Sequence, residues 1–395
     1  MARFSRERAP DGHAHASPLE LFYDLVFVFA ITQVSHYLLE HLSWEGTGQA
    51  AVILIAVWWS WNFTTWATNE LDTSAAPVKV MVIAVMLGSL LMAVAIPEAW
   101  GEQALLFAGA YVAIQVGRHS FMAFAVGTKG SLERLRAEQI VIWFIFSGIF
   151  WIAGALADEG TPRTVLWLIA VSIDLLEPVF VFRVPWLPKL GHEAWVVTSD
   201  HFAERFQLFV IIALGESIVI TGATTSDLDL TTTAVLAFAM AFVATASLWW
   251  IYFNRAAELM QGMLEKASDQ RTLLARDIYT YMHALVIAGV ILVAVGDEIV
   301  IAHPTDPLHG DELLVLVAGP ALYLMTLSLI RLRTAGTLSP KRTIAALACV
   351  AVGLLARDAE AIVVAGLLTA VLIALVVAEE FNFDRAGWRV SVERR

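Results

Sequence analysis

Apolar stretches of membrane-spanning length follow one another along this chain, and the polar segments between them are short. Windows of roughly 17–25 mostly apolar residues are typical of transmembrane helices. The twelve predicted helices cover residues 20–41, 49–69, 77–97, 103–126, 138–157, 164–183, 202–223, 232–254, 277–301, 312–333, 340–357 and 361–378. The longest polar segment, near 255–276, has the pattern of a short amphipathic helix. The sequence therefore predicts an all-α polytopic membrane protein.

Lysine and arginine are distributed unequally between the two sides that twelve alternating helices create. One side receives nearly all of them, including the N- and C-terminal tails, and the opposite loops hold only Arg163 and Arg357. Cytoplasmic loops carry the excess of these residues in membrane proteins, so both termini are predicted to be cytoplasmic. The N-terminal tail lacks the apolar core of a signal peptide, and we expect the first helix to insert the chain.

Two of the predicted helices resemble each other. Residues 17–36 read SPLELFYDLVFVFAITQVSH, and residues 201–219 read HFAERFQLFVIIALGESIV, so that Glu20 aligns with Glu204 and Phe22 with Phe206. Weaker matches in the next helices keep the same order and predict a duplication of six helices. Because six is even, the repeats would share one orientation, with the functional site expected at their interface. The predicted divisions are a tail at 1–16, repeats at 17–190 and 191–380, and a tail at 381–395.

Composition excludes several other classes of protein. The chain has 395 residues, of which 58% are hydrophobic and 16% charged, and its net charge of −12 argues against nucleic-acid binding. The single cysteine, Cys349, excludes an intramolecular disulfide and a thiolate cluster. No lysine lies in the middle of a predicted helix, which excludes a retinal Schiff base, and no hydrolase, zinc-protease or P-loop motif is present. Neither an enzymatic activity nor a cofactor is expected.

Polar groups gather on one face of the first predicted helix. At about 100° per residue this face holds Glu20, Asp24, Ile31 and Ser35, with Thr32 on its flank. In the second copy Glu204 begins the equivalent face, and Glu216 takes the place of Thr32. Ionisable residues at membrane depth are candidate functional residues, which favours a cation path with Ile31 at an apolar constriction. The alternative, weighed equally for Glu20, Asp24 and Glu204, is that the carboxylates pair with buried arginines and lock helices together.

Further ionisable residues are candidates for ion pairs or a proton relay. Arg118 is a possible partner for Asp24 or Glu204, and such a pair could be purely architectural. Asp174 and Glu177 lie three residues apart on one face, before Pro178, which can kink their helix. The two acids could coordinate protons or cations, or they could hydrogen-bond neighbouring helices. His283 could relay protons or make an ordinary interhelical hydrogen bond. The complete set is Arg118, Asp174, Glu177, His201, Arg205 and His283.

The two similar segments resemble the signature of the bacterial low-temperature-requirement A family. That family carries S-P-L-E-L-F-(F/Y)-D-L-V-F-V-F-A-I-T-Q near its N-terminus and later H-x-x-E-R-F-G-L-F-V-I-I-x-L-G-E-S. Residues 17–33 and 201–217 reproduce both, with Gln207 where the family often has glycine. The resemblance implies a multipass protein of the bacterial cytoplasmic (inner) membrane, linked by name to growth in the cold, without a secure biochemical activity.

The first segment is also similar to the first helix of a potassium-channel family with a Phe-Ser-Asp signature. Phe22 and Asp24 match the signature, and Tyr23 replaces its serine. The resemblance implies six-helix units whose first helices line a pore, which adds Phe22 to the predicted path, and the analogy extends to a homodimer. The second copy has Phe206, Gln207 and Leu208 at these positions, so half of the signature is lost.

The sequence thus predicts a membrane protein that conducts or transports a monovalent cation or protons along the helices that begin near residues 20 and 202. Its expected partners are the lipid bilayer, the transported ion and a second copy of the chain. The main alternative is a gradient-coupled transporter of a small solute. An intramembrane enzyme acting on lipid, and a sensor or assembly factor in which the charged residues are structural, are the other two.

Overall fold

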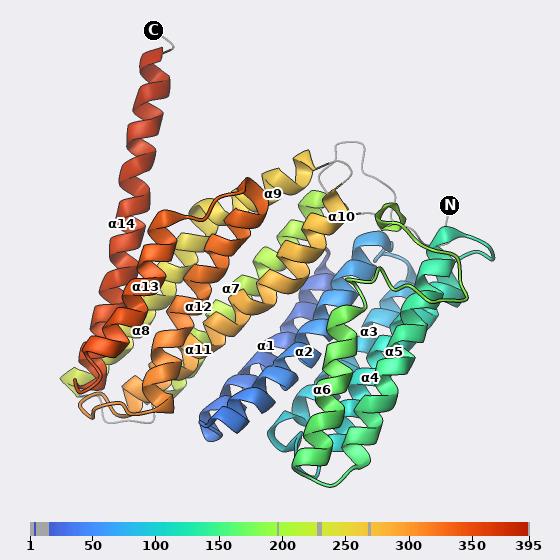
Figure 1. Ribbon diagram of the computed structural model, residues 1–395, viewed down its shortest axis with the longest axis horizontal. Helices are drawn as coiled ribbons and strands as arrows, with labels where there is room; N and C mark the ends of the chain where they lie inside the picture. Colours follow the sequence, from blue (N-terminus) through green and yellow to red (C-terminus); the bar gives the residue numbers. More distant parts are fainter. Residues whose placement is uncertain (1–3, 5–15, 196, 227–230, 268–269, 394–395) are drawn as a thin grey trace. The chain divides into compact units, whose positions relative to one another are not determined.

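The computed structural model describes residues 4, 16–195, 197–226, 231–267 and 270–393, and this part of the chain is helical and contains no β-strand (Figure 1). The helices are α1 Pro18–Glu40, α2 Trp44–Glu70, α3 Ala76–Val94, α4 Ala104–Phe121, α5 Leu132–Leu156, α6 Thr161–Leu176, α7 Ser199–Ser226, α8 Thr232–Ile251, α9 Ala257–Lys266, α10 Arg271–Leu274, α11 His283–Ala302, α12 Asp311–Ala335, α13 Pro340–Leu355 and α14 Ala361–Glu393. Short π-helical segments, Met122–Val126, Tyr252–Ala256 and Ala275–Met282, follow α4 and α8 and precede α11.

A helix occupies each of the twelve predicted windows, which confirms an all-helical membrane protein. Within the described residues, nine helices are long and apolar enough to cross a membrane. The exceptions among the twelve are α4, α6 and α13. Both α6 and α13 have 16 residues, or about 24 Å of helix, which is short for a hydrocarbon core of about 30 Å. Nine crossings are therefore supported by length and composition, and the other three remain predictions.

The start of α1 is fixed by a capping box. The Ser17 side chain accepts a hydrogen bond from the backbone N–H of Glu20, and Glu20 Oε2 accepts one from the backbone N–H of Ser17 at 2.8 Å. Pro18 occupies the first helical position, where its missing N–H costs nothing. Two backbone N–H groups at the start of α1, which lack a partner within the helix, are thereby hydrogen-bonded. The same contacts hold Glu20 in place from its own helix.

Two compact units make up the chain. The first comprises residues 1–212 and 264–280, and the second comprises residues 213–263 and 281–395, so the division falls inside α7. It does not coincide with the boundary predicted at residue 190. The duplication into two six-helix repeats stays a prediction.

In the first unit, α2 is the central helix. It packs against α1, α3, α4 and α6, and most of its length is buried. Trp58, Trp59 and Trp61 are at most 1% exposed, so they form the core of the unit and do not line its surface. Helices α3 to α6 pack in sequence order, each against the next.

In the second unit, α11 is the most deeply buried helix and packs closely on α12. Gly319 of α12 allows this approach, because a Cβ there would lie 2.7 Å from the backbone nitrogen of Val293 on α11. Small residues at helix interfaces are the usual means of close packing in membranes. Helix α13 packs against both α12 and α14, and α14 also packs against α8.

Candidate functional site

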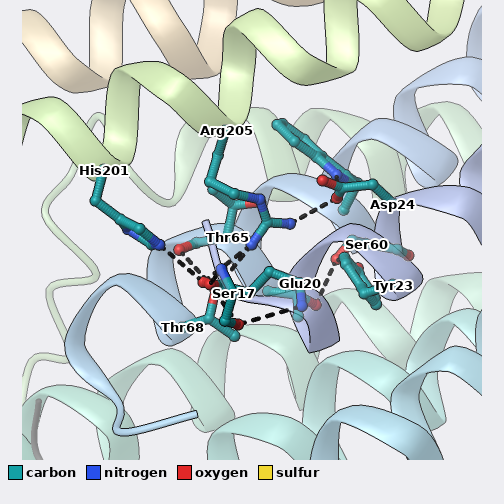
Figure 2. A network of polar contacts seen from close by, with 11 residues as sticks. Ser17, Glu20, Tyr23, Asp24, Ser60, Thr65, Thr68, His201 and Arg205 are labelled. Carbon is teal, nitrogen blue, oxygen red and sulfur yellow. Dashed lines mark hydrogen bonds and ion pairs between the residues drawn. The ribbon is translucent and has the colours of Figure 1, made fainter. Parts of the chain in front are cut away.

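The two signature segments meet in the first unit, in a cluster that we call the α1–α7 cluster: Glu20, Asp24, His201 and Arg205. The guanidinium of Arg205 lies between the two carboxylates, with Nη1 3.1 Å from Glu20 Oε1 and Nη2 2.6 Å from Asp24 Oδ1 (Figure 2). Nε2 of His201 lies 3.0 Å from the same Glu20 oxygen. All four side chains are at most 1% exposed. The cluster therefore joins α1 to the first half of α7.

The helix α2 completes the surroundings of Arg205. Nε1 of Trp61 donates a hydrogen bond of 2.7 Å to Asp24 Oδ1, and Arg205 Nη1 lies 3.3 Å from the hydroxyl of Thr68, which accepts from it. The guanidinium carbon lies 6.0 Å from the ring centres of both Tyr23 and Trp61. Charged pairs that leave water are retained only with good geometry and further hydrogen bonds, and this cluster has both.

Asp24 pairs with Arg205, and the predicted pair with Arg118 does not form within the described residues. Arg118, 1% exposed on α4, turns to α2, where it donates to the carbonyl of Ser60 at 3.2 Å and to the hydroxyl of Thr64 at 2.8 Å. It also donates to the side chain of Gln115 on its own helix. The hydrogen bonds of Arg118 thus go to a backbone carbonyl, a hydroxyl and an amide oxygen, and not to the carboxylate that the sequence suggested as its partner.

The remaining predicted path residues of α1 do not join the α1–α7 cluster. Ile31 and Ser35 are 1% exposed, in line with Glu20 and Asp24 on the buried face. Thr32 donates its hydroxyl hydrogen to the carbonyl of Val28 on the same helix, at 3.0 Å. Phe22 is 57% exposed and points away from this face.

The two acidic residues of the second copy lie in different units. Glu204 lies in the first unit and accepts a hydrogen bond of 3.0 Å from the backbone N–H of Ala16. Glu216, 3% exposed, lies in the second unit. Its role in an ion path stays a prediction.

A second group of buried acids lies at the end of α6. Oδ2 of Asp174 accepts hydrogen bonds from the hydroxyl of Tyr111, at 2.7 Å, and from Nε1 of Trp151, at 2.9 Å. Glu177 is completely buried. Within the described residues neither carboxylate has a lysine, arginine or histidine at ion-pair distance. Asp174 and Glu177 therefore differ from the acids of the α1–α7 cluster, which a guanidinium neutralises.

The kink predicted at Pro178 is wrong, because α6 ends at Leu176 instead. Proline lacks a backbone donor and disfavours the helical conformation of the residue before it. The chain then turns away through Val181 and Phe182, whose φ values of 54° and 51° lie in the left-handed region. Glu177 thus lies at a helix end and not inside a bent helix.

His283 lies in the second unit and is fully buried. The hydroxyl of Tyr252, in the π-helical segment after α8, lies 2.7 Å from His283 Nε2. This is the interhelical hydrogen bond that the sequence left as one alternative, and a proton-relay role is untested. Among the described residues, no group of three or more His, Cys, Asp or Glu side chains could hold a metal ion.

Comparison with known proteins identifies the family. Residues 15–377 match the model of the family described as bacterial low temperature requirement A protein (LtrA). The chain belongs to the LtrA family. An uncharacterized protein from Rhizobium meliloti (strain 1021) is 37% identical over 311 residues, which cover 78% of this chain and 75% of that protein. No solved structure matches the chain. The α1–α7 cluster therefore brings together the two segments by which this LtrA protein resembles its family.

Sequence reasoning missed two partners in this LtrA cluster. Ser17 and Glu20 have the spacing of a capping box, a signal that could have been found before the structure. The tryptophans of residues 58–66 are expected from the sequence to pack and hydrogen-bond between helices, but no local pattern identifies Asp24 as the acceptor for Trp61, because this bond depends on the packing of α2 against α1.

Proposed function

We propose that this LtrA protein transports protons across the membrane by way of the buried carboxylates of its first unit. The observation that carries the proposal is the burial of Asp174 and Glu177 without a cation at ion-pair distance among the described residues. An ionised carboxylate in such a place costs several kcal/mol, and acids at membrane depth are typical of proton pathways. Taking up a proton neutralises the carboxylate and removes this cost.

The geometry favours protons over potassium as the transported species. A potassium ion replaces its hydration shell with several oxygen ligands. Between Glu20 and Asp24 that position is taken by the guanidinium of Arg205, at 3.1 and 2.6 Å from the two carboxylates. A second cation would meet both the occupied oxygens and the repulsion of the arginine. Proton movement requires no such vacancy.

In this proposal the α1–α7 cluster is a second station for protons. It holds two carboxylates, one guanidinium and the imidazole of His201. Its net charge is zero when His201 carries a second proton and −1 when it does not. One proton can therefore enter or leave while Arg205 still bridges α1 and α7.

The test is proton flux into liposomes that contain the purified full-length chain. A potassium gradient with valinomycin sets the membrane potential, and a pH-sensitive dye inside the vesicles reports protons. We expect Asp174→Asn and Glu177→Gln each to reduce the flux at least about tenfold, because an amide side chain cannot take up and release a proton as the carboxylate does. Glu159→Gln, a 67% exposed acid, is the matched control and should keep the wild-type flux.

Two results would contradict the proposal. One is wild-type flux in both variants. The other is uptake of potassium by vesicles without valinomycin and without movement of protons, which would support the cation path along α1 instead. Saturable uptake of a small solute that depends on the proton gradient would indicate a gradient-coupled transporter that uses the same acids.

A structural role for the α1–α7 cluster has its own support, because each of its acids is paired. If the protein does not transport, wild type and variants alike give no flux, and neutralising Glu20 or Asp24 destroys folding and not an activity. Size-exclusion chromatography of each variant separates this outcome from loss of transport in a folded protein.

A further inference from the structure

A large cavity lies in the second unit where α12 ends and α13 begins. It has a volume of about 620 Å³, and its walls come from the segment that joins α8 to α9, from the end of α12, from the start of α13 and from α14. In Figure 1 these parts are found near the labels α9, α13 and α14. Binding pockets for small molecules usually have about 300–1,000 Å³, so the cavity is large enough for a phospholipid headgroup.

The charge of the cavity is strongly positive. Four basic residues line it, and one acid does: Arg255, Arg331, Lys341, Arg342 and Glu379. The acid is already bound by Arg342, with Nε 2.9 Å from Oε1 and Nη2 3.1 Å from Oε2. The cavity therefore carries an excess of positive charge that an anion would neutralise.

Two of the cations are available to a ligand. Arg331 is exposed and makes no side-chain hydrogen bond or ion pair among the described residues. Lys341 donates one hydrogen bond to the carbonyl of Ala378, which leaves two of its three N–H groups. Lys341 and Arg342 also lie in the first turn of α13, where the helix dipole disfavours positive charge. A bound anion would offset this repulsion.

The rest of the wall is apolar. Leu259, Met260 and Met263 of α9 face the cavity, as do Leu327 and Ile330 of α12. Leu259 is 64% exposed, so its side chain can contact a bound molecule. Met260, Leu327 and Ile330 are at most 3% exposed and already packed within the protein. An inorganic anion would leave the exposed surface of Leu259 and Met263 without a partner, whereas a molecule with an anionic head and an apolar body would contact both parts.

We propose that the cavity binds an anionic phospholipid, with its phosphate at Arg331 and Lys341 and the upper part of its acyl chains along Leu259 and Met263. Basic pockets between membrane helices on the cytoplasmic side bind anionic headgroups, and the lysine and arginine pattern predicts that this end of α12 is cytoplasmic. A zwitterionic lipid fits less well, because its ammonium group would meet the same cations.

The experiment is native mass spectrometry of the full-length chain in detergent, titrated with phosphatidylglycerol or phosphatidylcholine. We expect phosphatidylglycerol to bind roughly tenfold more tightly than phosphatidylcholine. Arg331→Gln and Lys341→Gln should each weaken the binding of phosphatidylglycerol roughly fivefold, as expected for one cation near the membrane surface. Arg333→Gln removes a charge from the same helix outside the cavity and should leave this binding unchanged.

Equal binding of the two lipids, or equal binding of phosphatidylglycerol by wild type and both variants, would overturn the proposal. Inorganic phosphate provides the other arm of the test. If millimolar phosphate displaces phosphatidylglycerol and binds alone with the same dependence on Arg331 and Lys341, the site is one for a free anion and not for a lipid. None of these readouts depends on proton flux.

Discussion

At the scale of single residues, Arg205 joins two helices of the first unit through buried ion pairs. It bridges Glu20 and Asp24 and is completely buried. Removing one partner of a buried ion pair leaves the other without compensation, at a cost of about 3–5 kcal/mol. The loss of the guanidinium removes an ion-pair partner from both carboxylates, of which Glu20 keeps His201 and Ser17.

We therefore expect Arg205→Gln to lower the free energy of unfolding in detergent by about 3–5 kcal/mol. Adding Asp24→Asn to this variant should cost much less than Asp24→Asn alone, with a coupling energy of about 0.5–3 kcal/mol. Arg134→Gln is the control, because Arg134 lies 2.7 Å from Glu138 in a partly exposed pair. Its loss should cost at most about 0.5 kcal/mol. Strict additivity of the Asp24 and Arg205 variants would show that their contact does not stabilise the fold.

The sequence predicted the ionisable members of the α1–α7 cluster but not their pairing. Glu20, Asp24, His201 and Arg205 were all candidates, because charge inside an apolar helix is conspicuous. Which arginine meets Asp24 depends on the packing of helices far apart in the chain, and no local pattern reports it. Arg118 was an equally reasonable partner until the acceptors on α2 were known.

At the scale of elements, the close contact between α11 and α12 allows helix packing to be tested. Gly319→Ala would place a methyl group 2.7 Å from the nitrogen and 2.8 Å from a side-chain carbon of Val293. Overpacking of this kind typically costs about 1–3 kcal/mol, so we expect the free energy of unfolding to fall by that amount.

Gly262→Ala provides the matched control for this change. Gly262 lies in α9, and an added Cβ there meets nothing within 4 Å. Alanine favours a helix over glycine by about 0.5–1 kcal/mol, so this variant should be as stable as wild type or slightly more stable. If the free energy of unfolding is the same for both variants, α11 and α12 can move apart to accommodate the added methyl group without a loss of stability.

The apolar windows of the sequence predicted the positions of the helices well and the ends of the helices less well. All twelve windows hold a helix, because burial of apolar side chains and satisfaction of the backbone act over whole turns. The end of α6 was placed too late, since a proline inside an apolar run can either kink a membrane helix or stop it. The left-handed φ angles of Val181 and Phe182 could not be anticipated from residues that rarely adopt them.

At the scale of the whole molecule, the number of crossings is the property to test. If α6 crosses the membrane, Asp158 before it and Lys189 after it face opposite sides. Both positions are exposed in the structure. Because Cys349 is the single cysteine, Cys349→Ala gives a background in which one new cysteine can be labelled.

We expect a membrane-impermeant maleimide added to intact cells to label Asp158→Cys and not Lys189→Cys. After the cells are opened, both should react. Labelling of both positions from outside would mean that α6 does not span the bilayer, and that the predicted orientation of every later helix must be inverted.

The pairing of Asp24 with Arg205 also sets an order of events in biosynthesis. Their separation is 181 residues, and at about 5–20 residues per second the ribosome needs roughly 10–40 s to bridge it. During that interval α1 has left the ribosome with two acids and without Arg205, the guanidinium that pairs with both in the folded unit. The cap from Ser17 is available to Glu20 from the start, because it comes from the same helix. The ion pairs that stabilise α1 in the bilayer therefore form only after the seventh helix has been inserted.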